Sequence, residues 1–365
     1  MLFIYASIAI VVFYFIIYIF FSFLFLRKDK LCSLPVDKEV TIIVPFRNEE
    51  KKIGQCVKSI LDQNYDVNKI ELICVNDHSS DKSIECLSKF KNVKVITLQE
   101  NQQGKKVAIN EGVKHATGNI IVVRDADTTC EKNWLSQLIN KQVATDADMV
   151  IGQVRYVGDF SFLSALQQTE HLAITITGAS TAKLGVPILC NGANLLFKKT
   201  TFHEVNGFSG NQTIASGDDI FLMNTFYSHN KKIEYCNSIH AAVICDTENN
   251  WIPFLSQRIR WATKNVHNKN KINFIIMSLI LSTNMLLPIM GIMSFFDSLF
   301  LPFTYFFLLI KFIADLLVIF IGSFHFKQLT ILCWFPLIFF VYPLEIIIIL
   351  TLGLFYNPYW KGRKI

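Results

Sequence analysis

An uncharged apolar segment opens the chain and sets the first limit on its fold. Residues 2–26 contain no Asp, Glu, Lys or Arg, and about 20 apolar residues are enough for a helix to cross a bilayer. The basic run RKDK follows at 27–30, and no small-residue cleavage site is evident. We therefore expect an uncleaved transmembrane anchor at 1–26 and not a signal peptide. Because Lys and Arg are enriched on the cytoplasmic side of membrane segments, the linker at 27–40 and the residues beyond it are expected in the cytoplasm.

Three further apolar blocks lie near the other end of the chain. They cover residues 272–296, 298–321 and 329–355. Of the 365 residues, 52% are hydrophobic and 18% are charged, and their gathering into blocks is typical of an integral membrane protein with one soluble domain. Three full crossings would place the basic tail 356–365 outside, against the charge rule. Pro336, Pro343 and Glu345 make the last of the three C-terminal membrane segments (272–355) the best candidate for a re-entrant or interfacial segment, which would keep the tail inside.

The positions of charged residues and cysteines indicate which ion pairs, partners and thiol states to expect. Lys311 and Asp315 stand one helical turn apart, so we expect an ion pair within one helix; a functional relay is the alternative. The formal net charge is +6 and the basic residues cluster beside apolar blocks, so membrane headgroups are expected as a partner and nucleic acid is not. The nine cysteines form no CxxC pair and no metal-finger spacing, which indicates reduced cytosolic thiols.

The middle of the chain alternates strand-like and helix-like segments. Strands are predicted at 41–45, 71–77, 93–98 and 119–127, and helices at 51–63, 80–90 and 105–116. Ser80 is the expected N-cap of the second helix. This order predicts a doubly wound α/β sheet with parallel strands, whose ligands gather at the carboxyl ends of the strands.

Acidic residues follow three of these predicted strands. FRNEE follows the first, NDHSSD the second, and the last strand ends in RDAD. In an extended segment Asp125 and Asp127 point to the same side, and two carboxylates so placed suit a hard divalent cation; turn acids facing solvent are the alternative. In SGDD, Asp218 and Asp219 precede an apolar helical run, which is ordinary for a helix N-terminus. Asp219 gains a functional meaning if the fold brings it near Asp127.

The run QRIRW is predicted to lie on an interfacial helix at 256–271. Gln257, Arg260 and Trp261 then share one face, while Arg258 points elsewhere and is expected to contact lipid headgroups. The arginine fork matches phosphate oxygens, and the indole offers a stacking face or an interfacial anchor. A basic and aromatic belt at the membrane surface is the alternative. Apolar spacing at 160–174 predicts either an amphipathic helix near the membrane or a core helix.

Together these motifs resemble the membrane-bound inverting glycosyltransferases of family 2. The resemblance rests on VPFRNEE, VNDHSSD, GKKVAINEG, RDAD, NGANLLFKK, SGDD and QRIRW, in that order, between an apolar anchor and terminal membrane segments. That family shares the GT-A fold, a Rossmann-like nucleotide-diphospho-sugar transferase fold, and includes ceramide glucosyltransferase and the cellulose, chitin and hyaluronan synthases. The resemblance implies a GT-A catalytic domain at 41–255 and transmembrane helices around it.

The same resemblance implies a role for each motif residue. The uracil and ribose of the donor would be held by Pro45, Asn48, Glu49 and Asp77, with Gly104 and Lys105 lining the same pocket. Asp125 would contact the ribose or sugar and Asp127 the Mg²⁺ or Mn²⁺ on the diphosphate, so that both acids belong to the metal site. Asp219 would be the general base, Gln257 and Arg260 would lie beside the diphosphate, and Asp218 and Trp261 would contact the acceptor. The family usually has Glu where this chain has Asp218.

The implied activity is transfer of a sugar from a nucleotide sugar, expected to be a UDP-sugar, to the hydroxyl of a lipid or lipid-linked acceptor with inversion. This is hexosyltransferase chemistry on a cell-envelope glycan, expected at a bacterial inner membrane with the catalytic domain facing the cytoplasm. A processive polysaccharide synthase is the alternative within the family, but three C-terminal segments are few for a polymer channel. A nucleotidyltransferase and an inactive membrane scaffold are alternatives outside it. The oligomeric state is left open.

Overall fold

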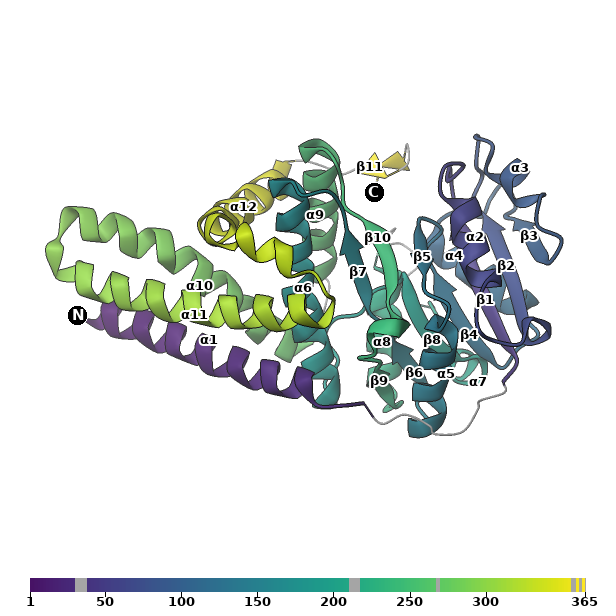
Figure 1. Cartoon of the computed structure of the whole chain (residues 1–365), viewed down its shortest axis with the longest axis horizontal. Coiled ribbons are helices and arrows are strands. Elements are labelled where there is room, and N and C mark those ends of the chain that lie inside the picture. Colours follow the sequence, from purple (N-terminus) through teal and green to yellow (C-terminus); the bar gives the residue numbers. More distant parts are fainter. Residues whose placement is uncertain (30–37, 210–216, 267–269, 356–358, 361–362, 365) are drawn as a thin grey trace. The chain divides into compact units, whose positions relative to one another are not determined.

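The computed structural model describes residues 1–29, 38–209, 217–266, 270–355, 359–360 and 363–364. Within these residues the chain forms two compact units, both drawn in Figure 1. The helical unit comprises Met1–Arg27, Gly158–Ser180 and Thr247–Pro358, and the sheet unit comprises Lys28–Val157, Thr181–Asp246 and Tyr359–Ile365. Each unit is therefore assembled from segments far apart in sequence, and the segment 41–255 contributes to both. Most of the linker at 27–40 and most of the tail at 356–365 lie outside the described residues.

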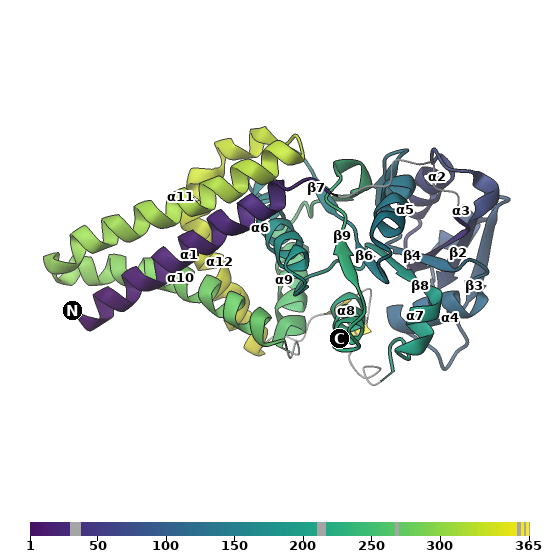
Figure 2. The same ribbon diagram turned by 90° about the horizontal axis from the view of Figure 1, so that it is seen from below.

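A seven-stranded sheet forms the core of the sheet unit (Figures 1 and 2). Its strands stand in the order β3-β2-β1-β4-β8-β6-β9. Their bounds are β1 (Val40–Phe46), β2 (Ile70–Asn76), β3 (Val93–Thr97), β4 (Ile120–Arg124), β6 (Met149–Ile151), β8 (Asn194–Lys198) and β9 (Ile233–Tyr235). β1 pairs in parallel with β2 and β4, whereas β8 runs antiparallel to β4 and β6. The predicted α/β sheet is confirmed, with parallel strands in its first half and mixed pairing in its second.

The central strands are continuous runs of apolar, mostly β-branched residues. Every residue of β1 and β4 is buried, as expected for strands covered by helices on both faces. The helices of this unit are α2 (Ile53–Leu61), α3 (Ser83–Leu87), α4 (Lys105–His115), α5 (Trp134–Thr145), α7 (Lys199–Glu204) and α8 (Asp218–Ser228). Gly112 lets α4 approach β1 closely, because an added Cβ there would lie 2.6 Å from the Ile43 side chain.

Two local predictions were wrong. Helix α3 begins at Ser83 after Lys82 and not after Ser80; the Ser80 amide instead donates to Asn48 Oδ1 at 2.8 Å, so a contact with another loop replaces the expected cap. Strand β4 ends at Arg124, and the backbone turns at Asp125, whose carbonyl accepts a hydrogen bond from the Thr128 hydroxyl at 2.8 Å. Asp125 and Asp127 therefore lie in a turn, and the period-two argument does not apply to them.

Shorter elements complete the structure. A three-stranded sheet in the order β5-β10-β7 is formed by β5 (Thr128–Cys130), β10 (Val243–Asp246) and β7 (Val154–Val157). The remaining short elements are η1 (Val67–Lys69), η2 (Ile239–Ala241), η3 (Ser298–Phe300), η4 (Leu329–Cys333), β11 (Tyr359–Trp360) and β12 (Arg363–Lys364). Since β5 follows Asp127 directly, its pairing with β10 fixes where the chain leaves the turn that carries the two acids.

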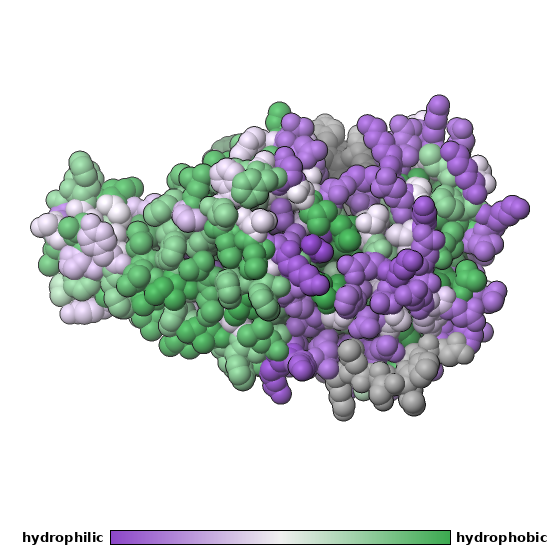
Figure 3. Space-filling view, in the orientation of Figure 1, coloured by the Kyte–Doolittle hydropathy of each residue, from purple (hydrophilic) through white to green (hydrophobic). Residues whose placement is uncertain are grey.

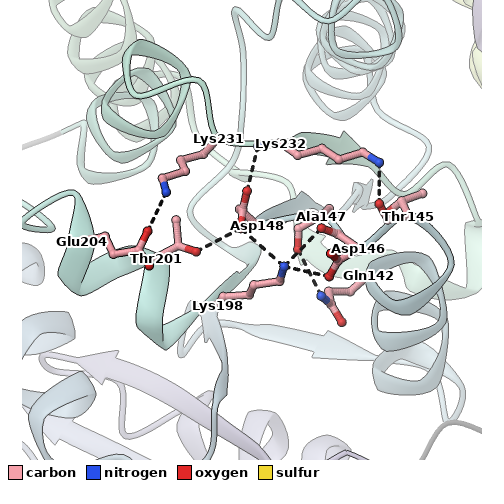
Figure 4. Close-up of polar contacts among 10 residues, drawn as sticks. All are labelled: Gln142, Thr145, Asp146, Ala147, Asp148, Lys198, Thr201, Glu204, Lys231 and Lys232. Atoms are coloured by element: carbon pink, nitrogen blue, oxygen red, sulfur yellow. Dashed lines mark hydrogen bonds and ion pairs between the residues drawn. The ribbon is translucent and has the colours of Figure 1, made fainter.

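A lysine and two aspartates form ion pairs at the end of the sheet opposite the carboxyl ends of β1, β2 and β4 (Figure 4). Lys198 Nζ lies 2.8 Å from Asp146 Oδ1 and 3.5 Å from Asp148 Oδ1. Asp148 also accepts from Thr201 Oγ1 at 3.0 Å and from the Lys232 amide at 2.9 Å. These contacts join the end of β8 to the chain segments that enter β6 and β9.

The helical unit contains six long helices. They are α1 (Leu2–Leu26), α6 (Phe162–Lys183), α9 (Trp251–Val266), α10 (Lys271–Phe296), α11 (Leu301–His325) and α12 (Phe335–Phe355). Four helical spans in the described residues are long and apolar enough to cross a membrane: Leu2–Leu26, Lys271–Phe296, Ser298–His325 and Phe335–Gly353. Helices α1, α10 and α11 lie side by side in both ribbon views, and Figure 3 shows a largely hydrophobic surface over them.

Several polar side chains inside this unit are paired with one another. Lys311 Nζ lies 2.5 Å from Asp315 Oδ2, which confirms the predicted ion pair within one helix, and the Tyr14 hydroxyl donates to Asp315 Oδ1 at 2.6 Å. Helix α6 carries buried glutamines, such as Gln168, which accepts from Gln328 Nε2 at 2.8 Å. The burial of most residues of α6 agrees with a core helix, the second alternative for the segment 160–174.

Candidate active site

The loops that follow β1 and β2 are bound to each other at the carboxyl edge of the sheet. The Asp77 amide donates to the Phe46 carbonyl at 2.9 Å, and Arg47 Nη1 donates to the Asp77 carbonyl at 2.7 Å. The buried Asp77 carboxylate accepts from the Gly104 amide at 3.1 Å. Gly104 has φ of 97°, a backbone conformation that glycine adopts at little cost, and it precedes α4. Asp77 is thereby joined to the start of the helix that carries Lys105.

The other residues predicted to bind the nucleotide lie on the same two loops or beside them. Pro45 is in β1 at the level of Val75, beyond the last pairing of β1 with β4, so its missing N–H removes no bond to β4. Asn48 accepts from the Ser80 amide, and the Glu49 amide donates to Ser83 Oγ at 2.7 Å. The structure therefore gathers Pro45, Asn48, Glu49 and Asp77 at one edge of the sheet.

Lys105 connects two of the acidic motifs. Its Nζ atom lies 2.7 Å from Asp125 Oδ1 and 3.1 Å from Asp218 Oδ2. The lysine and Asp218 side chains are largely buried, at 19% and 9% exposure. Burial works against the charged ammonium, but Asp125, Asp218 and Asp219 outweigh it and raise the pKa of Lys105. Lys105 is therefore a charged side chain between RDAD and SGDD, although the two motifs are far apart in sequence.

Asp219 is oriented by backbone amides. Its Oδ2 accepts from the Gly192 amide at 3.0 Å and its Oδ1 from the Ile220 amide at 2.9 Å. An added Cβ at Gly192 would lie 2.9 Å from Lys105 Nζ and 3.0 Å from Asp218 Oδ2, so a side chain there would crowd the lysine and its acids. Gly192 belongs to the site but was not among the predicted site residues. Its signal in the sequence is NGAN, directly before a strand.

Asp125 and Asp127 have different neighbours. Asp125 forms an ion pair with Lys105. Asp127 is instead an electrostatic neighbour of Lys52 and Cys245. Burial lowers the pKa of Lys52, but a hydrogen-bonded ion pair with Asp246 at 3.1 Å and the charge of Asp127 raise it overall. Asp219 is brought close to the RDAD motif through Lys105, which is an electrostatic neighbour of both Asp219 and Asp125.

A buried arginine holds the turn that carries these two acids. The Arg124 guanidinium is fully buried and lies 5.0 Å from the centre of the Trp134 ring. Its Nε donates to Thr128 Oγ1 at 3.1 Å and its Nη2 donates to the Thr128 carbonyl at 2.8 Å. Since Thr128 Oγ1 in turn donates to the Asp125 carbonyl, Arg124 fixes both ends of the turn. Sequence reasoning missed this residue; a lone charge ending an apolar strand was the available signal.

The two acids of the turn after β4 offer at most a partial ligand set for a hard divalent cation. Among the described residues no group of three or more His, Cys, Asp or Glu side chains could hold a metal ion. Mg²⁺ is commonly held by one or two carboxylates, with water and phosphate oxygens completing its ligands. Two aspartates in one turn are this kind of donor set. Asp125 and Asp127 would hold such an ion.

The QRIRW residues lie on α9 in the helical unit. Arg258 is buried, with 6% exposure, and pairs with Glu170 of α6 at 2.6 Å. The expectation that Arg258 contacts lipid headgroups was therefore wrong, because a helical wheel gives the faces of a helix but not what covers each face. Gln257, Arg260 and Trp261 are partly exposed.

Comparisons with known proteins identify the family. The family model described as glycosyl transferase family 2 matches residues 41–202, from β1 into α7. Glycosyltransferase GlyG of Streptococcus pneumoniae is 32% identical over 211 residues, which cover 54% of this chain and 68% of GlyG. This chain belongs to glycosyl transferase family 2. The expected GT-A type fold and glycosyltransferase class are thus confirmed.

Other known proteins are similar to this chain over different lengths. The probable glycosyltransferase YdaM of Bacillus subtilis is 26% identical over 248 residues, covering 65% of this chain and 57% of YdaM. Glycosyltransferase GlyA of Streptococcus pneumoniae is 32% identical over 119 residues, which are 32% of this chain and only 17% of GlyA. A mannosyltransferase of Pyrobaculum calidifontis, solved with GDP-Man and Mn²⁺, has a TM-score of 0.56 at 14% identity and 96% coverage of both chains. That similarity extends the shared fold beyond the family 2 domain.

Proposed function

We propose that this family 2 member transfers a sugar from a nucleotide sugar, in the UDP-sugar class, to a hydroxyl of a lipid or lipid-linked acceptor. The reaction would invert the anomeric centre and depend on Mg²⁺ or Mn²⁺. The observation that carries the proposal is the convergence of three motifs at one edge of the sheet. Asp77 joins the start of α4, and Lys105 on that helix bridges Asp125 and Asp218.

Each acid would serve a different part of the reaction. Asp77, with Pro45, Asn48, Glu49 and Gly104 nearby, would hold the nucleoside. Asp219 would take the proton of the acceptor hydroxyl, which is typically worth about 10²- to 10⁴-fold in rate. Two amides already orient its carboxylate. One base and a single displacement, without a carboxylate nucleophile, would invert the anomeric carbon.

The leaving diphosphate would be met by positive charge. A divalent cation held by Asp125 and Asp127 would supply Lewis-acid stabilisation of the diphosphate when bound. Gln257 and Arg260 would contact the diphosphate through hydrogen bonds suited to phosphate oxygens. Trp261 and Asp218 would contact the acceptor. The mannosyltransferase of similar fold was solved with a nucleotide sugar and Mn²⁺, and we carry that chemical class over as part of the proposal.

Membrane helices favour an acceptor that resides in the bilayer. Four apolar spans long enough to cross a membrane flank the catalytic segments. We further propose that α12, with Pro343 and Glu345 inside it, is a re-entrant or interfacial segment and not a full crossing, which would leave the basic tail and the catalytic segments on the cytoplasmic side of a bacterial inner membrane. A soluble acceptor would give no reason for membrane helices in the same chain.

Turnover of labelled nucleotide sugars tests the proposal. Native membranes containing the protein would be incubated with a panel of radiolabelled UDP- and GDP-sugars and Mn²⁺ or Mg²⁺, and products would be separated by organic extraction. We expect release of a nucleoside diphosphate and label in the lipid fraction. The Asp219→Asn variant should lose transfer, while Asp146→Asn, at the opposite end of the sheet, should keep it.

Other outcomes assign other functions. Full transfer by Asp219→Asn would remove the base assignment. A ladder of long products would favour a processive synthase, and pyrophosphate formed from a nucleoside triphosphate would identify a nucleotidyltransferase. Binding of nucleotide sugar without any turnover would identify an inactive scaffold.

A further inference from the structure

Arg258 is a buried cation inside the signature helix α9. Its side chain is 6% exposed and that of its partner Glu170 is 8% exposed. Both Nη2 and Nε of the arginine contact Glu170 Oε2, at 2.6 and 2.8 Å. An uncompensated buried charge is costly, and breaking a buried pair by removing one partner is strongly destabilising. The pair therefore holds the guanidinium in one place between α6 and α9.

The held guanidinium contacts two neighbouring side chains of QRIRW. Arg258 Nη1 donates to Gln257 Oε1 at 2.6 Å. The guanidinium carbon lies 4.4 Å from the centre of the Trp261 ring and 4.6 Å from that of the Phe254 ring. Phe254 and Trp261 stand four residues before and three residues after Arg258, so both rings lie on its side of the helix. The planar cation is enclosed by one ring on each of the adjacent helical turns.

Helix α12 adds a second acid to this cluster. Glu345 is 4% exposed and is an electrostatic neighbour of both Glu170 and Arg258. Tyr342, one turn earlier on α12, is an electrostatic neighbour of the same two glutamates. Three helices of the helical unit therefore meet around one arginine, and the arginine is the residue that contacts Gln257 and Trp261.

We propose that Arg258 is a positioning residue, held by Glu170, that sets the conformations of Gln257 and Trp261. This inference rests on the proposed function, in which Gln257 contacts the donor diphosphate and Trp261 the acceptor. The two arginines of QRIRW then have different tasks: Arg260 contacts substrate, and Arg258 arranges the side chains that do so. The guanidinium shape matters as well as its charge, because one planar group must reach a carboxylate, an amide oxygen and two rings.

Lysine at this position separates positioning from simple stabilisation. Arg258→Lys keeps the charge beside Glu170 but has no planar fork to contact Gln257 and stack on Trp261. We expect its melting temperature to stay close to that of the natural protein, while KM for donor and for acceptor each rises about tenfold or more. Glu170→Gln, which releases the guanidinium, should raise both KM values as well. A purely structural role predicts the natural KM values in Arg258→Lys.

A spectroscopic readout makes the test independent of turnover. Protein labelled with 5-fluorotryptophan gives a fluorine resonance for Trp261, assigned with Trp261→Phe. We expect Arg258→Lys and Glu170→Gln to shift or broaden that resonance. The matched control is Lys311→Met/Asp315→Asn, which removes another buried pair of the same unit and should leave both the resonance and the KM values unchanged.

The outcomes separate this inference from the proposed function. An unchanged Trp261 resonance together with unchanged KM values in both variants would overturn the positioning role. A changed resonance in a protein that turns over no nucleotide sugar would retain the contact between Arg258 and Trp261 but refute the proposed function. An equal effect of the control pair on the resonance would reduce Arg258 to a general stabilising residue.

Discussion

The sheet unit carries the same arrangement of charges at both ends of its sheet, a lysine between two aspartates. At the carboxyl edge Lys105 lies 2.7 Å from Asp125 and 3.1 Å from Asp218. At the opposite edge Lys198 lies 2.8 Å from Asp146 and 3.5 Å from Asp148 (Figure 4). The distances are similar, so distance does not explain why only one of the two clusters is a candidate active site.

Burial and further partners distinguish the two clusters. Asp146 is 87% exposed, whereas Asp218 is 9% exposed. Asp148 also binds the backbone and a hydroxyl of adjoining segments, which is typical of a structural contact. The acids around Lys105 belong to motifs at strand and helix ends, where a ligand can reach them. A lysine between two aspartates therefore does not by itself indicate a functional site. Its burial and its position in the sheet must be known as well.

Removing the buried lysine should have the largest effect. In Lys105→Met the Asp125 and Asp218 carboxylates lose the cation between them. We expect sugar transfer to fall about 100-fold or more, as when one preorganised electrostatic partner is removed. The free energy of unfolding should fall by about 2 kcal/mol, less than for a fully buried pair because Asp125 is 35% exposed. Transfer assays and urea unfolding measure the two effects, and near-natural transfer would remove Lys105 from the site.

Crowding the same cluster without removing a charge should have a smaller effect. Gly192→Ala would place a Cβ 2.9 Å from Lys105 Nζ, and the flexible lysine would have to move. We expect transfer to fall about tenfold with little change in melting temperature. The matched control is Gly54→Ala in α2, where an added Cβ meets nothing within 4 Å. It should keep full transfer and raise the free energy of unfolding by about 0.5 to 1 kcal/mol.

The exposed cluster should respond only in stability. Lys198→Met removes a lysine whose partner Asp146 is largely in solvent, so the unfolding free energy should fall by at most about 1 kcal/mol. The loss should shrink as salt is added, because screening weakens exposed pairs. Transfer should stay within about twofold of the natural rate, since charge changes far from a site act weakly on it. A loss of transfer comparable with that of Lys105→Met would contradict the assignment of the Lys198 cluster to a structural role.

The smallest effect is expected at Asp146. The hydrogen-bonded ion pair with Lys198 lowers the pKa of Asp146 below the ordinary value of 3.8. A carboxylate with a lowered pKa stabilises the folded state above its unfolded pKa, and this is lost as the pH falls through the folded pKa. Asp146→Asn should therefore be slightly less stable than the natural protein at neutral pH, and the difference should begin to shrink as the pH falls below 3.8 and be gone below the lowered pKa. Thermal unfolding of both proteins as the pH is lowered measures this difference, and a difference that does not shrink with falling pH would have another cause.

The sequence predicted most of the first half of the sheet unit, because continuous β-branched strands alternate there with amphipathic helices. It did not predict the antiparallel β8, since local pattern does not encode strand direction. The turn at Asp125 was not predicted because it depends on contacts inside the core. The buried Arg124 side chain binds Thr128, and the strand ends at Arg124. Arg258 was misplaced for a related reason: its burial is due to Glu170, 88 residues earlier in the chain.

The acidic edge of the sheet has a thermodynamic consequence. Asp77, Asp125, Asp127, Asp218 and Asp219 gather there, with Lys105 between two of them. In the proposed reaction a nucleoside diphosphate would bring further negative charge to this edge, so its binding should be linked to cation uptake. Linkage is reciprocal, which means that nucleotide must tighten the cation by the same factor by which the cation tightens the nucleotide. Under the proposed function, affinities measured for either ligand alone would therefore be weaker than those measured with both ligands present.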